Sequence, residues 1–429
     1  MYRCKSCHKH EAIKKGIRRN QQKYFCLNCR KYFSRPLTRK SAPVNNEVLL
    51  DHLEGISYRK LQNRTGVQKK KLCQIVNMEI SNLPDNLEMT KQCFDQLKYS
   101  GNLVVDGKYV PVKEFIDTDQ SEAMGKIPKS RKRQKVKRGK VLIWGADYDS
   151  HDLPHFEFGD SESDIVFNDY FHTLKANNYP LKSLTTDDKG EAIRAVRRHY
   201  PDCVIQLCTK HYMAKLNRAL VTQSIAVKLR VKEKKIEKLF PEPESECIPV
   251  SRKYSLKQIV KLANEMAELE FRYELLFDFQ SIIIGILTAP DYQTAQDRIE
   301  SLDKYFWPKR QKMNFPKEQI RLVKKLLADF RDNQEYLLNY LKYPHLNIPA
   351  TTNLLEGFNS QLELRLSSIR GFETIATAKN YINAWIIKRR LTKFTDCRNG
   401  FKKLNGKSPL ECAGVDISKS KHLLKAFRF

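Results

Sequence analysis

Near the N-terminus, apolar and polar positions alternate with the period of short helices. Residues 45–80, "NNEVLLDHLEGISYRKLQNRTGVQKKKLCQIVNMEI", predict three short helices, with Ser57 as a helix cap and Gly66 in a turn. The part "ISYRKLQNRTGVQKKKLCQIV" fits a helix-turn-helix, whose second helix carries three consecutive lysines, Lys69, Lys70 and Lys71. DNA binding is one interpretation of this segment, and an ordinary helical hairpin is the other. The stretch "NLPDN" predicts a boundary near residue 85.

From residue 102 the period shortens to that of strands. "NLVVDGKYVPV" is rich in β-formers, and "KVLIWGADYDS" followed by "DLPHFEF" predicts a strand pair. Next come a helical pattern in "SDIVFNDYFHTLKANN", a strand in "LKSLTT", a helix in "GEAIRAVRRHY" and a strand in "DCVIQLC". Three strands followed by helix, strand, helix and strand predict a mixed α/β sheet.

The remaining pattern is helical. Residues 215–345 predict mostly helices, interrupted by the proline-rich stretch "FPEPESECIPVS", which we expect to be an exposed loop. The longest apolar patch, "FQSIIIGILTAP", is too short to span a membrane and predicts a buried helix. In "TTNLLEGFNSQLELRLSSIRGF" an apolar stripe predicts a helix, with Glu356 off the stripe. Asn353 and Glu356 have the spacing of a capping box, so Glu356 is either a cap or a metal ligand.

The net charge of the chain indicates which class of molecule it binds. The chain of 429 residues has 78 Lys and Arg against 49 Asp and Glu, a net charge of +29. Such an excess favours a polyanionic partner, and nucleic acid is the usual one, although a merely basic surface is the alternative. Residues 126–140 hold nine Lys or Arg, predicting a loop that contacts phosphates through side chains that include Arg131, Lys132 and Arg133.

Cysteines predict a metal site. "CKSC" and "CLNC" are two CxxC pairs separated by eighteen residues, a spacing that fits a zinc ribbon with ligands Cys4, Cys7, Cys26 and Cys29. Four thiolates fill the shell of the ion, so this zinc is structural. The odd total of 11 cysteines without an apolar leader indicates thiols in a reducing interior.

Three acidic residues are candidates for phosphodiester chemistry, which uses carboxylates to hold two Mg²⁺ or Mn²⁺ ions. Asp106 lies in a predicted strand, although Asp-Gly between β-runs is also a favoured hairpin turn. Asp187 ends a later strand, at the sheet edge where α/β proteins bind ligands. Asp188 has capping-box spacing with Glu191, which leaves Asp187 as the candidate ligand.

These residues carry a resemblance to a known family. "VVDGKYV", "TTDDKGEAIRAVRRHYPDCVIQLCTKH", the Glu356 helix and the tail "YINAWIIKRRLTKFTDCRNGFKKLNGKSPLECAG" resemble DDE transposases of bacterial insertion sequences, in the Mutator-like group. The resemblance implies a ribonuclease-H-like α/β core, interrupted by an all-helical insertion and preceded by the zinc ribbon and helix-turn-helix. It also implies a catalytic triad of Asp106, Asp187 and Glu356. The family usually has Gly after its second acid, where this chain has Asp188.

The resemblance implies further roles. Cys208 and His211 of "CTKH" match a family CxxH pair, expected to support the site by packing and hydrogen bonding. An aromatic residue of the insertion can stack on an extruded base, which makes Trp307 a candidate, with core packing as the alternative. Arg365 and Arg370 can reach DNA phosphates or be ordinary surface residues.

The sequence therefore predicts a DNA transposase that binds terminal inverted repeats and target DNA as a dimer or larger assembly, in the bacterial cytoplasm at the nucleoid. A zinc-ribbon and helix-turn-helix regulator with a degenerate core, and a nuclease that cuts without joining, are the rivals. The expected domains are a zinc ribbon, a helix-turn-helix, the first part of the core, the insertion, the second part of the core and a basic tail, at residues 1–38, 39–85, 98–215, 216–345, 346–395 and 396–429.

Overall fold

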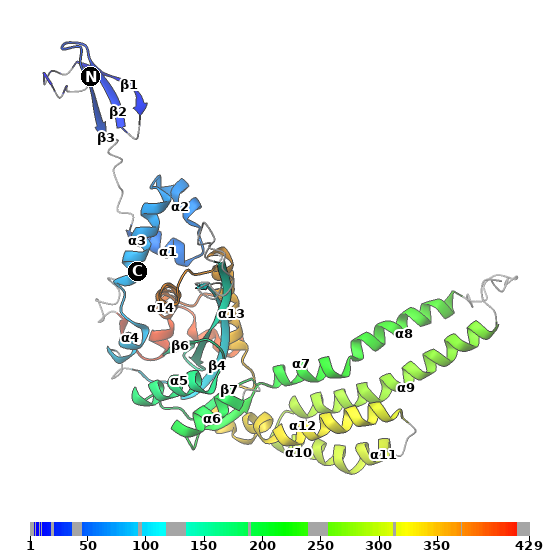
Figure 1. Cartoon of the computed structure of the whole chain (residues 1–429). Coiled ribbons are helices and arrows are strands. Elements are labelled where there is room, and N and C mark those ends of the chain that lie inside the picture. Colours follow the sequence, from blue (N-terminus) through cyan, green and yellow to red (C-terminus); the bar gives the residue numbers. More distant parts are fainter. Residues whose placement is uncertain are drawn as a thin grey trace, which may run out of the picture. The chain divides into compact units, whose positions relative to one another are not determined.

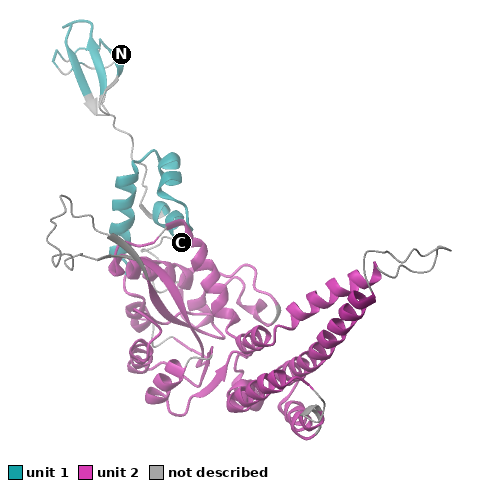
Figure 2. Cartoon of the chain, turned by 45° about the vertical axis from the view of Figure 1, so that its right-hand side comes forward, with its two compact units in different colours: residues 1–83, 425–429 teal, residues 84–424 magenta. Residues whose placement is uncertain are grey.

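The computed structural model describes residues 4, 6–7, 9, 11–18, 21–36, 45–92, 97–116, 134–187, 190–238, 256–311, 315–369 and 371–417. Within it, residues 1–83 and residues 84–424 form two compact units (Figure 2). None of the described helices is both long and apolar enough to cross a membrane.

The first unit begins with a small antiparallel sheet. Its strands are β1 (Ala12–Arg18), β2 (Gln21–Cys26) and β3 (Tyr32–Pro36), in the order β1-β2-β3. Its core holds Cys4, Ala12, Tyr24 and Cys26, and the ring of Tyr24 stacks on Phe33 at 5.2 Å. So small a core leaves much of the stability to whatever joins the cysteines.

Three helices follow, as the sequence predicts: α1 (Asn45–Leu53), α2 (Tyr58–Thr65) and α3 (Lys69–Ser81). Ser57 caps α2 by accepting a hydrogen bond from the Lys60 amide. Gly66 ends α2 in the left-handed region with φ of 69°, a conformation that favours glycine. Both local predictions are therefore confirmed. Leu61, Leu72 and Val76 are fully buried between the helices.

The second unit is built on a five-stranded mixed sheet (Figure 1). Its order is β6-β5-β4-β7-β8, and the strands are β4 (Asn102–Ile116), β5 (Gln134–Asp147), β6 (Phe156–Gly159), β7 (Ser183–Thr186) and β8 (Val204–Leu207). β4, β5 and β6 are antiparallel neighbours, whereas β4, β7 and β8 run parallel. The predicted mixed α/β sheet is confirmed.

Helices cover both faces of this sheet. One face packs on α5 (Asp164–Ala176) and α6 (Gly190–His199), in a core that joins Leu103 and Ile143 to Phe167 and Ala192. The other face carries Trp144, whose ring lies against Phe358 and Trp385 of α13 (Asn353–Ile369) and α14 (Ile375–Leu391). The short helices α4 (Asn86–Gln92), η5 (Asn399–Leu404) and α15 (Pro409–Cys412) complete this part.

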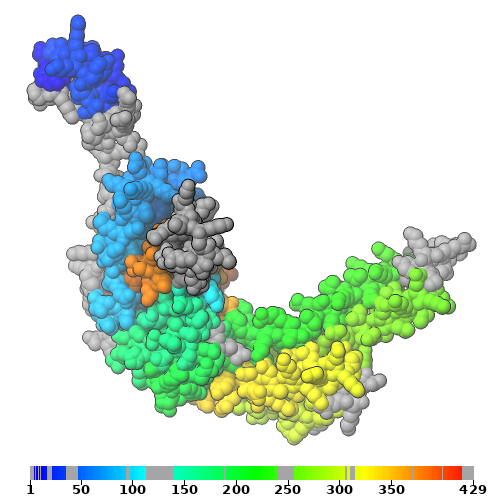
Figure 3. Space-filling view, in the orientation of Figure 1, coloured from blue at the N-terminus to red at the C-terminus, as the bar shows by residue number. Residues whose placement is uncertain are grey.

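A helical segment separates β8 from α13, green to yellow in Figure 3. It contains α7 (Thr209–Leu220), α8 (Thr222–Glu237), α9 (Leu256–Leu287), α10 (Tyr292–Ser301), η3 (Leu302–Phe306), α11 (Trp307–Gln311), α12 (Lys317–Lys342) and η4 (Pro344–Leu346). The apolar patch in α9 is buried at Phe279, Ile283 and Ile286, as the sequence predicts. The proline-rich stretch at 240–251 lies outside the described residues.

Candidate active site

Asp106 lies within β4, where it pairs with Trp144 of β5. The antiparallel pairing continues without interruption through Asp106 and Gly107, so the alternative of a hairpin turn at Asp-Gly is wrong. Side chains alternate between the faces of a strand, and Asp106 therefore shares a face with Val104, the face that α13 covers. The carboxylate is thus directed at the helix that carries Glu356.

The register of the parallel strands, extended past their last pair, predicts that Asp187 lies beside Asp106. β4 pairs with β7 at Leu103 with Leu184 and at Val104 with Thr185. Continued along both chains, this offset brings Asp106 level with Asp187, which directly follows the last residue of β7. Neighbouring strands lie about 4.8 Å apart, so on this extension the two acids begin from adjacent positions, just past the point where the pairing of β4 with β7 ends. Asp188 lies outside the described residues.

The third acid approaches from α13. Asn359, one turn after Glu356, donates a hydrogen bond of 2.9 Å to Asp106 Oδ2. Its own Oδ1 accepts a bond of 3.2 Å from Nε1 of the buried Trp144. Residues three apart on a helix lie on neighbouring parts of its surface, so this link brings Glu356 to the same end of the sheet as Asp106.

Glu356 is not a helix cap. Asn353 is itself the first residue of α13, and its Oδ1 accepts a hydrogen bond of 2.9 Å from Lys210 Nζ. The same ammonium group lies 2.6 Å from Glu356 Oε2. Both side chains of the expected capping box thus meet on a lysine of α7, and this alternative is wrong.

Cys208 and His211 lie beside these carboxylates. Cys208 directly follows β8, and its sulfur accepts bonds of 3.3 Å from the amide and the hydroxyl of Thr352. A hydrogen bond with Cys208 raises the pKa of His211, and the negative charges of Asp187 and Glu356 raise it further. His211 Nε2 is 3.7 Å from Glu356 Oε1. His211 is therefore close enough to two of the three acids for their charges to act on it.

One carboxylate oxygen of Glu356 is suited to bind a divalent cation. Glu356 Oε1 is buried and accepts no hydrogen bond from a described residue, which suits an oxygen that meets a cation. Carboxylate oxygens are also the ligands that Mg²⁺ prefers. Among the described residues, however, only the four N-terminal cysteines have ligand atoms that all lie within 4.8 Å of one another.

Those cysteines do converge. Cys4 Sγ is 3.6 Å from Cys29 Sγ, and Cys7 Sγ is 3.5 Å from Cys26 Sγ. A hydrogen bond from the Cys7 amide lowers the pKa of Cys4 to about 6, although burial acts in the opposite direction. The lowered pKa favours the thiolate, which is the form that binds metal. The group can therefore hold a structural zinc ion.

The remaining predicted residues are dispersed. Lys69, Lys70 and Lys71 are exposed in the first turn of α3. Arg365 is half-buried on α13, near Tyr381. Trp307 is only 8 % exposed and belongs to the core of the helical segment, which is the packing alternative. Arg131, Lys132, Arg133 and Arg370 lie outside the described residues. Residues 134–140 of the expected basic loop instead form the start of β5, paired with β4, so the loop prediction is wrong there.

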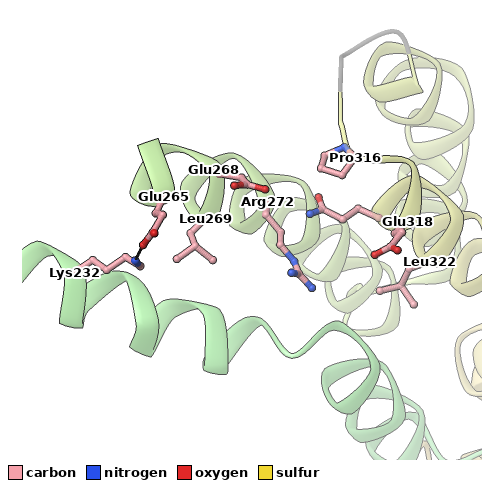
Figure 4. A pocket seen from close by; sticks show the side chains of 9 residues that line it. Lys232, Glu265, Glu268, Leu269, Arg272, Pro316, Glu318 and Leu322 are labelled. Atoms are coloured by element: carbon pink, nitrogen blue, oxygen red, sulfur yellow. Dashed lines mark hydrogen bonds and ion pairs between the residues drawn. The ribbon is translucent and has the colours of Figure 1, made fainter. Parts of the chain in front are cut away.

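A cavity of about 560 Å³ lies elsewhere, between α8, α9 and the start of α12 (Figure 4). Lys232 and Glu265 form an ion pair at its edge, and Leu269 and Leu322 line it. None of the three candidate acids lines this cavity, so it is not part of the candidate active site.

The sequence alone did not assign a role to Lys210 or to the contact between Asn359 and Asp106. The one local sign of Lys210 is its place inside "CTKH", between two residues that the resemblance singles out. Asn359 precedes no recognisable motif, and its partner is 253 residues away. Only the folded chain brings these groups together.

No protein-family model matches the chain, and no curated protein matches it. Among solved structures, a chain titled "Drosophila P element transposase strand transfer complex" is 13 % identical, with a TM-score of 0.39. The match covers 83 % of this chain and 93 % of that chain. What this site can do must therefore follow from its own residues.

Proposed function

We propose that this protein is a DDE-type DNA transposase. In this proposal it binds the terminal inverted repeats of an element, cleaves DNA at the ends and joins the freed 3′-hydroxyls to target DNA. The core belongs to the ribonuclease-H-like class, with residues between β8 and α13 as its helical insertion. Support comes from the resemblance of the three acidic motifs, the net charge of +29 and the arrangement of the acids.

One observation carries most of the proposal. The register of β4 and β7, extended two residues past its last pair of Val104 with Thr185, brings Asp106 level with Asp187, and Asn359 ties Asp106 to the helix of Glu356. These three acids come from segments far apart along the chain. A purely structural role does not call for acids at these three positions, because carboxylates brought near one another repel each other. Chemistry on a phosphodiester does call for them, since it needs cations held against the scissile bond.

Each residue has a part in this proposal. Asp106, Asp187 and Glu356 would hold the cations, and Asn359 and the Gly107 amide orient Asp106 by hydrogen bonds to Oδ2 and Oδ1. Cys208 and Thr352 hold the ring of His211 beside the carboxylates. Two Mg²⁺ or Mn²⁺ ions, if bound there, would activate the attacking oxygen and stabilise the leaving oxygen. No covalent link between protein and DNA is required.

In the first unit, we assign recognition of the element ends to the zinc ribbon and the helix-turn-helix. The exposed lysines that begin α3 are suited to phosphate contacts. Two DNA ends must be cut together, so the active form in this proposal is a dimer or a larger assembly.

The test is a joining assay with element-end DNA, a target plasmid and Mg²⁺. Joined products that vanish in Glu356→Gln, while DNA binding persists, support the transposase. Glu363→Gln is the matched control, because Glu363 lies on the same helix but pairs with Lys108. Cleavage without joining would identify a nuclease, and binding without cleavage would identify a regulator.

A further inference from the structure

Lys210 makes contacts that an ordinary surface lysine does not make. It lies in the first turn of α7, between Cys208 and His211 along the chain. Its ammonium group is 2.6 Å from Glu356 Oε2 and 2.9 Å from Asn353 Oδ1. The side chain nevertheless remains 51 % exposed. The ammonium group thus contacts a candidate metal ligand and is also open to water. It can therefore leave Glu356 without first breaking the packing of the core.

The two carboxylate oxygens of Glu356 have different surroundings. Oε2 is taken by Lys210, whereas Oε1 is buried, faces His211 at 3.7 Å and accepts no hydrogen bond from a described residue. A divalent cation bound through both oxygens therefore requires the ammonium group to move away. Repulsion between the ammonium group and the arriving cation acts in the same direction.

We propose that Lys210 is an exchangeable counter-ion: it neutralises Glu356 when the site holds no metal ion and moves to a DNA phosphate when metal binds. This inference rests on the proposed function, because it takes Glu356 to be a metal ligand. A lysine suits such an exchange better than an arginine, since its ammonium group is a compact charge on a flexible stem that makes no fixed two-point contact.

The exchange has a simple electrostatic basis. Without metal, three carboxylates carry negative charge at one end of the sheet, and Lys210 offsets part of it. With divalent cations bound, that negative charge is neutralised and the lysine is left without its partner. A phosphate drawn to the cations then offers the nearest new negative charge. The same side chain thus stabilises the site in both states.

The first experiment measures metal binding without DNA. Mn²⁺ is titrated into zinc-loaded protein, and free Mn²⁺ is followed by electron paramagnetic resonance. A half-exposed ion pair contributes little, so Lys210→Gln should bind Mn²⁺ about threefold more tightly than wild type. Lys215→Gln is the matched control, because Lys215 lies on the same helix and pairs with Asp329 at 3.0 Å. Its Mn²⁺ affinity should equal that of wild type.

The second experiment measures binding to a short random-sequence DNA duplex as a function of salt. With Ca²⁺ present, Lys210→Gln should lower the slope of log affinity against log salt by about 0.9, the loss of one phosphate contact. Without divalent cations the slope should not change, because Glu356 then holds the lysine. Lys215→Gln should leave both slopes unchanged. Equal melting temperatures of the variants establish that they are folded.

The outcomes separate this inference from the proposed function. If Glu356→Gln weakens Mn²⁺ binding but Lys210→Gln leaves it unchanged or weakens it, the exchange is wrong and the metal site stands. If the slope changes equally with and without Ca²⁺, Lys210 is an ordinary phosphate contact and the exchange is again wrong. If Glu356→Gln has no effect on Mn²⁺ binding, both proposals fail together.

Discussion

Asn359 donates a hydrogen bond to Asp106 from the middle of α13, across 253 residues of sequence. Its amide has no freedom to turn over, because Oδ1 is held by the indole N–H of Trp144. Trp144 in turn is fully buried between the sheet and the two helices that cover it. The orientation of one candidate ligand is thereby fixed by the hydrophobic core.

This relationship makes a prediction for Asn359→Leu. The substitution keeps the branched shape of the side chain but removes the donor to Asp106 and leaves the Trp144 N–H without its acceptor. Loss of such an outer partner typically costs 10- to 100-fold in metal affinity or activity, and we expect a loss of about that size in strand transfer and in Mn²⁺ affinity. Gln361→Ala, an exposed position on the same helix, is the control. Unchanged activity in Asn359→Leu would show that Asp106 needs no such support.

Local structure followed from local pattern. Ser57 and Gly66 are a cap and a turn because their side chains suit those backbone positions, and the strand and helix order of the α/β sheet follows from its periodicity. The alternatives for Asp106 and Glu356 failed for the opposite reason. A hairpin turn and a capping box are local interpretations, and tertiary contacts with Trp144 and Lys210 overrode them.

Local sequence patterns could not predict the long-range contacts that complete the site. Lys210 and Glu356 are separated by 146 residues, and their meeting depends on how the segment between β8 and α13 returns to the sheet. No periodicity encodes that return. Trp307 illustrates the same limit, since an aromatic residue among cations is equally compatible with a surface or a core, and only packing distinguishes the two.

The four-cysteine group gives a second prediction. Cys26→Ser should abolish zinc binding and unfold the three-stranded sheet, because its core has few other buried side chains and metal binding supplies most of its folding free energy. Zinc content is measured by atomic emission, and element-end binding is measured in parallel. Cys73→Ser, a half-buried cysteine of α3, is the matched control and should retain zinc. Full zinc content in Cys26→Ser would exclude this ligand set.

A third prediction concerns an ion pair buried in the second unit. Arg390 and Asp152 are both fully buried, at 2.8 Å, and Arg390 also donates to the carbonyl and side chain of Asn86. Removing one charge leaves the other without compensation in the core, so Arg390→Met should lower the free energy of unfolding by about 3–5 kcal/mol. Arg194→Gln, which breaks an exposed pair with Asp164, should cost less than about 1 kcal/mol.

Urea unfolding measures both changes. The double variant Arg390→Met with Asp152→Leu removes both charges, and we expect it to recover part of the loss. A loss in Arg390→Met no larger than that in Arg194→Gln would mean that water reaches the pair.

A fourth prediction follows from His151. Burial, followed by the positive charge of Arg389, lowers the pKa of His151 from 6.5 to about 4. Its ring packs on Phe401 and Phe394, and Nε2 is buried without a hydrogen bond to a described residue. Between these two pKa values the unfolded chain takes up a proton that the folded chain does not. The folded state is therefore favoured fully above pH 6.5 and loses up to about 3 kcal/mol as the pH falls toward 4.

His151→Asn is the substitution that tests this effect. The backbone at His151 has φ of 57°, in the left-handed region, and asparagine tolerates that conformation better than most residues. Urea unfolding of both proteins at pH 7 and at pH 4.5 cancels the contributions of other groups. The variant should be less stable than wild type at pH 7, since it loses ring packing, but its stability should fall less on acidification. An equal fall in both proteins would mean that His151 titrates normally in the folded state.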